Sequence, residues 1–172
     1  MTSIVNRMIR AAKLDAQLYE EVEADKETLS QAMCVVVLAS IAAGIGSGGL
    51  GGLSGFFIGT VGALISWFIW AALTYFIGTK ILPEPTTRAD IGELLRTTGF
   101  SSSPGLIRIF GLVPGITNVV FFISNVWMLT AMIIAVRQAL DYQSTLRAVG
   151  VCIIGWIIQG SVLMLLLSFI TT

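Results

Sequence analysis

The chain has 172 residues, of which 55% are hydrophobic, and its ten acidic and ten basic side chains give a formal net charge of zero. Only 12% of the residues are charged, against about 25% in soluble domains. This composition indicates a membrane protein. The balanced charge argues against a nucleic-acid partner, which would require a basic surface.

The residue types that most often carry chemistry are scarce. Histidine is absent, and the two cysteines, Cys34 and Cys152, lie apart in apolar segments with no second cysteine close by. Histidine is the commonest metal ligand and the usual acid or base near neutral pH. No carboxylate interrupts the long uncharged stretches, so a pair of intramembrane acids is not expected either. We therefore expect no catalytic residues, no metal site and no cofactor.

Residues 1–30 form a charged arm. Between residues 4 and 29, apolar side chains recur at steps of three and four, as in Ile4, Met8 and Ala11, which predicts a single amphipathic helix. Basic side chains fill its first half and acidic side chains its second. We expect this helix to lie flat on the membrane, with its apolar face among the lipid headgroups.

The arm is followed by three long uncharged stretches, 28–79, 97–136 and 148–172, which only Arg108 interrupts. A helix needs about 20 mostly apolar residues to cross a bilayer, so the fold class predicted for residues 31–172 is an all-α bundle of membrane-spanning helices. The third predicted helix is short and contains Arg108. The helices are expected at residues 31–47, 54–79, 99–112, 115–137 and 147–170.

The distribution of basic residues decides whether segment 99–112 crosses the membrane. If it crosses, all basic regions fall on one side, and the uncharged link 46–53, turn 111–115 and C-terminal tail fall on the other. Since basic loops stay in the cytoplasm, we expect five crossings, with a cytoplasmic N-terminus and an external C-terminus. In a prokaryote this would be the plasma membrane. The alternative is four crossings with 99–112 as a re-entrant element. The basic residues concerned are Arg7, Arg10, Lys13 and Lys26 in the arm, Lys80, Arg88 and Arg96 after the second helix, and Arg137 and Arg147 before the last.

Nine of the eighteen glycines fall between residues 44 and 62. A Gly-x-Gly-x-x-Gly pattern occurs there at Gly44, Gly46 and Gly49, but an apolar helix precedes it where a nucleotide-binding fold would have a strand. Further on, Gly55, Gly59 and Ala63 form a ridge of small residues, a pattern typical of closely packed membrane helices.

Two sets of polar residues are candidates for a functional site. Arg108, Asn118, Asn125 and Gln159 lie inside the predicted spans and would form a polar path if they met; alternatively, Arg108 extends to the outer interface. The second set would form a cytoplasmic docking face for a partner, although an acidic run is also typical of a solvated surface. It comprises Glu20, Glu21, Glu23, Asp25, Asp90, Glu93, Arg96, Arg137 and Asp141.

Several short motifs distinguish the chain. They are LYEEVEAD at 18–25, QA at 31–32, AD at 89–90, LLRTTGF at 94–100, PG at 104–105, GLVPG at 111–115, WM at 127–128, AVRQALDY at 135–142, ST at 144–145 and RA at 147–148. In these motifs the chain resembles the bacterial branch of the Yip1 family over almost its full length. The resemblance implies a membrane domain of five helices.

Eukaryotic members of that family are trafficking factors that bind Rab GTPases and one another. Their Asp-Leu-Tyr-Gly-Pro motif is missing here, and the Ala-Leu-Asp-Tyr-Gln sequence at 139–143 is only a loose counterpart. A prokaryotic host would also lack Rab proteins. The resemblance therefore implies a shared membrane fold that acts on lipid or on partners, without a GTPase contact.

Two functions from different classes are consistent with the sequence. The first is a non-enzymatic membrane adaptor or membrane-organising factor with a cytoplasmic docking face. The alternative is a small transporter, channel or lipid scramblase with a polar path through the bundle. The expected partners are membrane lipids, a second copy of the chain or another membrane protein.

Overall fold

The computed structural model describes residues 3–48 and 52–170, and every regular element in these ranges is a helix, as predicted. Residues 49–51 of the predicted uncharged link, including Gly49, and the predicted external end at Thr172 lie outside the described residues. The elements are α1 (Ile4–Ala12), α2 (Ala16–Ala24), η1 (Lys26–Thr28), α3 (Leu29–Gly46), α4 (Gly52–Phe76), η2 (Ile77–Ile81), α5 (Ile91–Phe100), η3 (Ser103–Leu112), α6 (Thr117–Ala139) and α7 (Thr145–Ile170).

Among the described residues, four segments are long and apolar enough to cross a membrane, and they match four of the five predicted helices. They are Lys26–Gly46, Phe57–Ile81, Thr117–Ala139 and Thr145–Val162.

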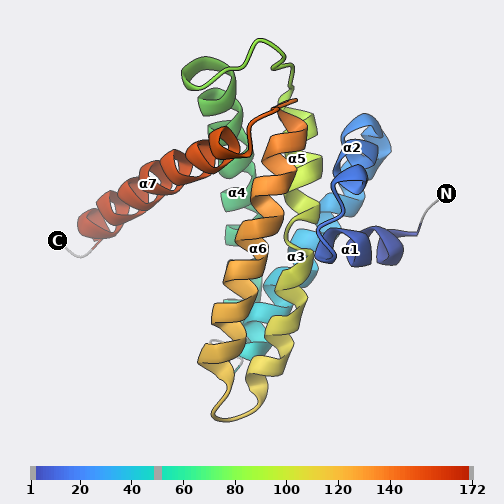
Figure 1. Cartoon of the computed structure of the whole chain (residues 1–172). Helices are drawn as coiled ribbons and strands as arrows, with labels where there is room; N and C mark the ends of the chain where they lie inside the picture. Colours follow the sequence, from blue (N-terminus) through green and yellow to red (C-terminus); the bar gives the residue numbers. More distant parts are fainter. Residues whose placement is uncertain (1–2, 49–51, 171–172) are drawn as a thin grey trace.

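The remaining predicted crossing, 99–112, lies in a rod composed of α5 and η3. Each part has ten residues, and a rise of about 1.5 Å per residue in the α-helix and 2.0 Å in the 3-10 helix gives the rod a length of about 35 Å. The rod runs antiparallel to α6 and lies beside α3, while α7 diverges from the bundle (Figure 1).

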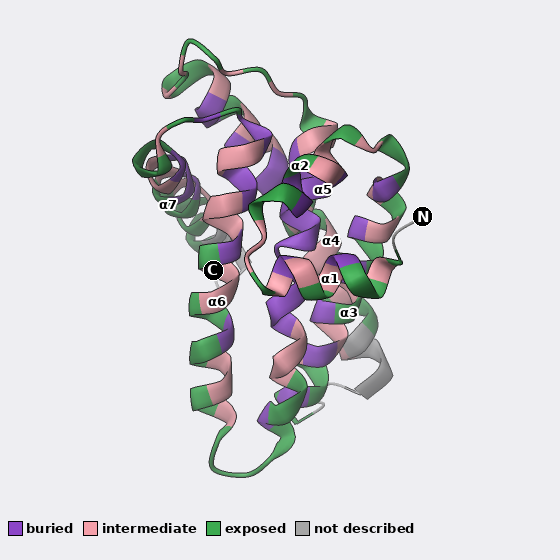
Figure 2. Cartoon of the chain, turned by 45° about the vertical axis from the view of Figure 1, so that its right-hand side comes forward, coloured by how far each residue is buried: buried purple, intermediate pink, exposed green. Residues whose placement is uncertain are grey.

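The bundle has two chemically different ends (Figure 1). We call one the arm end: it carries α2 and the loops at 82–90 and 140–144, which touch where the Thr86 hydroxyl donates to the Asp141 carbonyl at 3.0 Å. We call the other the turn end, because it carries the turn at 111–115 between η3 and α6. Buried residues concentrate toward the arm end (Figure 2), whereas Phe110 and Phe122, near the turn end, remain 62% and 69% exposed. Exposed aromatic side chains of this kind suit a hydrocarbon solvent.

Helix α5 forms the centre of the arm end, and all its residues from Leu94 to Phe100 are buried. Buried hydroxyl groups need hydrogen-bond partners, and here they find them within the helix. Thr97 donates to the Glu93 carbonyl at 3.0 Å and Ser101 to the Thr98 carbonyl at 2.7 Å. These local bonds allow a helix with many polar residues to pack against apolar neighbours on every side.

The prediction of one continuous helix over 4–29 is wrong. The chain breaks between α1 and α2, where Leu14 adopts a left-handed conformation with φ 62°. Asp15 stops α1 and starts α2: its carboxylate accepts from the Gln17 backbone N–H at 3.0 Å and pairs with Arg10 at 2.7 Å. Capping of this kind favours a new helix over continuation of the old one.

The break also changes how the arm lies. Helix α1 keeps the amphipathic character that was predicted, and the indole N–H of Trp127 on α6 fixes its end by donating to the Ala12 carbonyl at 2.7 Å. Helix α2 packs on the bundle instead of lying flat on lipid, because Leu18, Tyr19 and Val22 are fully buried against it.

Helix α3 and η3 approach very closely near the turn end. A Cβ atom added at Gly46 would lie 1.8 Å from the backbone oxygen of Arg108, which no side-chain rearrangement can relieve. On the same helix, a Cβ added at Gly44 meets nothing within 4 Å. Glycine is therefore required at position 46 by close approach of the backbones, and not merely tolerated.

We predict that Gly46→Ala destabilises the fold by about 1–3 kcal/mol, since overpacking forces the two backbones apart. The thermal unfolding midpoint in mild detergent measures the effect. Gly44→Ala is the matched control and should leave the midpoint unchanged. Equal midpoints for the two variants would contradict the observed α3–η3 contact.

Candidate functional site

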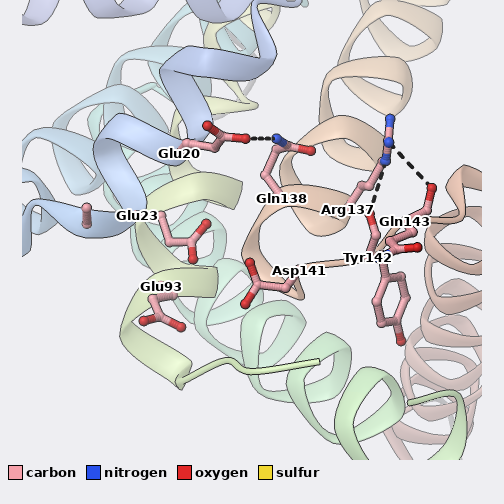
Figure 3. A pocket seen from close by; sticks show the side chains of 9 residues that line it. Glu20, Glu23, Glu93, Arg137, Gln138, Asp141, Tyr142 and Gln143 are labelled. Atoms are coloured by element: carbon pink, nitrogen blue, oxygen red, sulfur yellow. Dashed lines mark hydrogen bonds between the residues drawn. The ribbon is translucent and has the colours of Figure 1, made fainter. Parts of the chain in front are cut away.

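Four carboxylates surround a hollow at the arm end (Figure 3). Glu20 and Glu23 come from α2, Glu93 from the first turn of α5, and Asp141 from the loop that follows α6. The hollow has a volume of about 650 Å³ and is open to one side. We call it the acidic hollow; its remaining lining residues are Ala24, Arg137, Gln138, Tyr142 and Gln143.

Helix α2 supplies two of the carboxylates, and its C-terminal end is held by Arg96. Arg96 of α5 is only 5% exposed, and its guanidinium donates to the carbonyls of Val22 and Glu23, with 3.0 Å between its Nε and the Val22 oxygen. A cation at the end of a helix also interacts favourably with the helix dipole. The Glu20 carboxylate in turn accepts from the Gln138 amide at 2.7 Å, which connects α2 with α6 (Figure 3).

The α5 side of the hollow is held by a capping box. The Asp90 carboxylate accepts from the Glu93 N–H at 2.8 Å, and the Glu93 carboxylate accepts from the Asp90 N–H at 2.7 Å. This reciprocal pair satisfies two backbone donors at the start of the helix. It also fixes Glu93 beside Glu23, while Asp90 itself does not line the hollow.

The α6 side is held by its own backbone contacts. Asp141 has φ 53°, a left-handed conformation that ends the helix. Arg137 reaches past it to donate to the carbonyls of Tyr142 and Gln143 (Figure 3). The Tyr142 hydroxyl donates to the Leu82 carbonyl at 2.7 Å, so the two loops of the arm end are joined beneath the site.

The charges of the hollow are unequal, with four carboxylates facing one guanidinium. Burial raises the pKa of Glu23 to about 7, with further contributions from the negative charges of Glu93 and Asp141, while Arg96 opposes the shift. Burial and neighbouring negative charges disfavour the ionised form of this carboxyl group. A cation that binds beside it would offset the repulsion and stabilise the carboxylate.

The other predicted docking residues have different partners. Glu21 pairs with Arg7 at 3.3 Å and with Arg10 at 2.6 Å, and Asp25 pairs with Arg7 at 3.1 Å. Hydrogen bonds from Arg10 keep the pKa of Glu21 below its usual value. The acidic run of the arm therefore divides: one part neutralises the basic half of the arm, and the other part faces the hollow.

The structure joins two of the four residues of the predicted polar path. The Arg108 guanidinium donates to the Asn125 side chain at 2.5 Å. Asn118 lies two turns earlier on α6 and is exposed, and Gln159 lies on the diverging helix α7. Within residues 3–48 and 52–170, no group of three or more histidine, cysteine, aspartate or glutamate side chains could hold a metal ion.

A comparison with protein families agrees with this architecture, because the Yip1 domain profile matches residues 16–167. The chain belongs to the Yip1 family. This is a family of non-catalytic membrane proteins. No curated protein and no solved structure matches the chain.

Sequence reasoning on this Yip1 domain missed four lining residues of the hollow, namely Ala24, Gln138, Tyr142 and Gln143. Gln138 follows the predicted docking residue Arg137 in the last turn of α6, so its place at the edge of the docking face could have been recognised. Tyr142 and Gln143 follow the helix, where the loop path decides their position and no sequence pattern reports it.

We predict a pH-dependent stability that depends on Glu23. Its pKa rises from 4.5 to about 7 on folding, so its contribution to stability is complete below pH 4.5 and is lost as the pH rises through about 7. Glu23→Gln should remove this part of the slope and make the Yip1 domain more stable than the wild type at a pH of about 8.

Thermal unfolding midpoints measured across this pH range test the prediction. Glu27→Gln changes an exposed acid of the same arm and should retain the wild-type slope. If Glu23→Gln leaves the slope unchanged, Glu23 is not the group that titrates.

Proposed function

We propose that this Yip1-family chain is a non-enzymatic membrane adaptor whose acidic hollow binds a basic segment of a partner membrane protein. One observation carries the proposal: α2, α5 and the end of α6 bring four carboxylates around an open hollow that a single arginine does not neutralise. Like charges held together without a counter-ion destabilise one another. A lysine or arginine side chain of the partner would relieve that repulsion, so the hollow favours basic segments over neutral or acidic ones.

The framework around the hollow supports docking, because hydrogen bonds hold the carboxylates of Glu20 and Glu93 before a partner arrives. The capping box positions Glu93 at the start of α5. The Glu20–Gln138 hydrogen bond connects α2 with α6, and Arg96 connects α5 with the end of α2. A preorganised site loses little side-chain entropy on binding. Specificity then follows from Arg137, which opposes partners whose positive charge falls near the Tyr142 side of the hollow.

We further propose a topology of five crossings, with the arm end in the cytoplasm and the C-terminus outside. The contact between Thr86 and Asp141 and the ion pair between Glu84 and Arg147 at 3.5 Å support it, since they hold the loops after α4 and after α6 at the same end. Chain segments between those loops must then cross an even number of times. The α5–η3 rod, about 35 Å long, supplies the crossing that pairs with α6.

Cysteine labelling tests this topology. In a variant in which Cys34 and Cys152 are replaced by alanine, a cysteine at position 86 should react only from the cytoplasm of sealed cells, and one at position 113 only from outside. A cysteine at position 143 serves as the control for the arm end. Reaction at 86 and 113 from the same side would favour the re-entrant alternative.

Binding of a lysine-rich peptide to the detergent-solubilised chain tests the docking function. Glu23→Gln with Asp141→Asn removes two charges from the hollow and should weaken binding about five- to tenfold, since exposed ion pairs contribute up to about 1 kcal/mol each. Wild-type binding should also strengthen as the pH rises through about 7, because the cation favours the ionised form of Glu23.

The matched control is Glu27→Gln with Asp90→Asn, which removes two charges outside the hollow and retains a good helix cap at position 90. It should bind the peptide as the wild type does. Equal loss of affinity in both double variants would indicate general electrostatic attraction and contradict a defined docking site.

A further inference from the structure

Arg108 lies in a second cavity at the opposite end of the bundle. The cavity has a volume of about 440 Å³ and is open to one side. Ser40 of α3 and Ser47, which directly follows that helix, line one side of the cavity. Gly59 and Ala63 of α4, Arg108 of η3 and Phe121 of α6 also line it.

The guanidinium of Arg108 is only partly satisfied by protein. One terminal nitrogen donates to Asn125, and the guanidinium carbon stands 5.6 Å from the centre of the Phe121 ring. The Nε atom is buried and has no hydrogen-bond partner in the described part of the chain. An unpaired buried donor on a charged group is costly. Protein atoms cover Nε, so an incoming acceptor reaches the guanidinium at its terminal nitrogens, of which one already donates to Asn125.

The protein has no negative charge to offer at this depth. The stretches 28–79, 97–136 and 148–172 contain no carboxylate, and Arg108 is their only charged residue. Burial of an uncompensated charge in hydrocarbon is unfavourable, and such residues pair with a partner or reach the interface. An anion that neutralises Arg108 in place has to come from outside these stretches, and the bilayer is a source of such anions.

The position of Arg108 places its side chain within reach of lipid headgroups. Its backbone oxygen packs on Gly46, the last residue of α3, and it precedes the turn at 111–115 by about one turn of η3. Phosphates are the anions found at the edge of the hydrocarbon layer, and arginine binds them with several donors at once.

We propose that this cavity binds one anionic glycerophospholipid from the leaflet at the turn end, with its phosphate on Arg108. The phosphate accepts from Nη1, the terminal nitrogen that does not bind Asn125, while Asn125 holds Nη2 and Phe121 lies over the guanidinium face. Gly59 and Ala63 leave the space for the headgroup. The acyl chains lie along exposed apolar side chains of α4 and η3, the helices that carry Gly59 and Arg108; Ile58, Ile109 and Phe110 are exposed there.

Native mass spectrometry of the full chain in mild detergent tests the proposal, with 1-palmitoyl-2-oleoyl phosphatidylglycerol as the probe. The wild type should retain one lipid, and Arg108→Gln should bind it at least about tenfold more weakly, since hydrogen bonds to charged groups are among the stronger ones. Arg108→Lys, which keeps the charge and loses the planar fork, should be intermediate. Equal binding by the wild type and Arg108→Gln would overturn the assignment.

A second pair of variants leaves the arginine intact and therefore does not depend on the stability of Arg108→Gln. A Cβ added at Gly59 or at Gly62 meets nothing within 4 Å, but only Gly59 lines the cavity. Gly59→Leu should occupy part of the cavity and weaken lipid binding about tenfold, whereas Gly62→Leu should bind as the wild type does. Equal binding by these two variants would show that the lipid does not occupy the cavity.

Two further probes identify the part of the lipid that is recognised. 1-Palmitoyl-2-oleoylglycerol, which has the same acyl chains without a phosphate, should not be retained. Inorganic phosphate should not displace the retained phosphatidylglycerol. Retention of the uncharged lipid would mean that the cavity selects acyl chains only, and displacement by inorganic phosphate would mean that it takes a free anion; either result would overturn the proposal.

Discussion

The contact between Arg96 and the end of α2 connects the core of the molecule with its candidate site. Arg96 lies in the buried part of α5, and its guanidinium donates hydrogen bonds to the carbonyls of Val22 and Glu23. Both carbonyls lie in the last turn of α2, where helix carbonyls commonly lack backbone donors; the Val22 carbonyl also accepts from the Thr28 hydroxyl at 2.9 Å. Because α2 also carries Glu20 and Glu23, one buried cation determines both the packing of the arm and the position of half of the hollow's carboxylates.

Charge in the arm is sorted by helix face. Arg7 and Arg10 neutralise Glu21 and Asp25 within the arm itself. Glu20 and Glu23 project toward α5 and α6, where Arg137 lines the hollow with them and Arg96 binds the Glu23 carbonyl but does not pair with either carboxylate. A run of acids that looks uniform in the sequence is therefore two groups, one that stabilises the arm and one that remains available to a cation.

The two ends of the bundle follow different packing rules. At the arm end, Tyr19, Phe100 and Leu140 are fully buried, as in the core of a soluble domain. Toward the turn end, large apolar side chains stay exposed and close packing relies on glycine, as at Gly46. Water drives the first kind of packing through the hydrophobic effect. In lipid that driving force is absent, so contact between backbones and occasional polar pairs such as Arg108–Asn125 take its place.

The sequence by itself determined the class of the protein and four long helices, because hydrocarbon excludes charge and the uncharged stretches mark the spans within a few residues. It also marked the pool of acidic residues from which the hollow is drawn. Tertiary structure alone decided the break at Leu14, the burial of Arg96 and the division of the acids, since each depends on which neighbour a side chain meets. The periodicity of apolar residues shows on which face of a helix a residue lies. It does not show which element covers that face, and that element determines the burial and the charge partners of these residues.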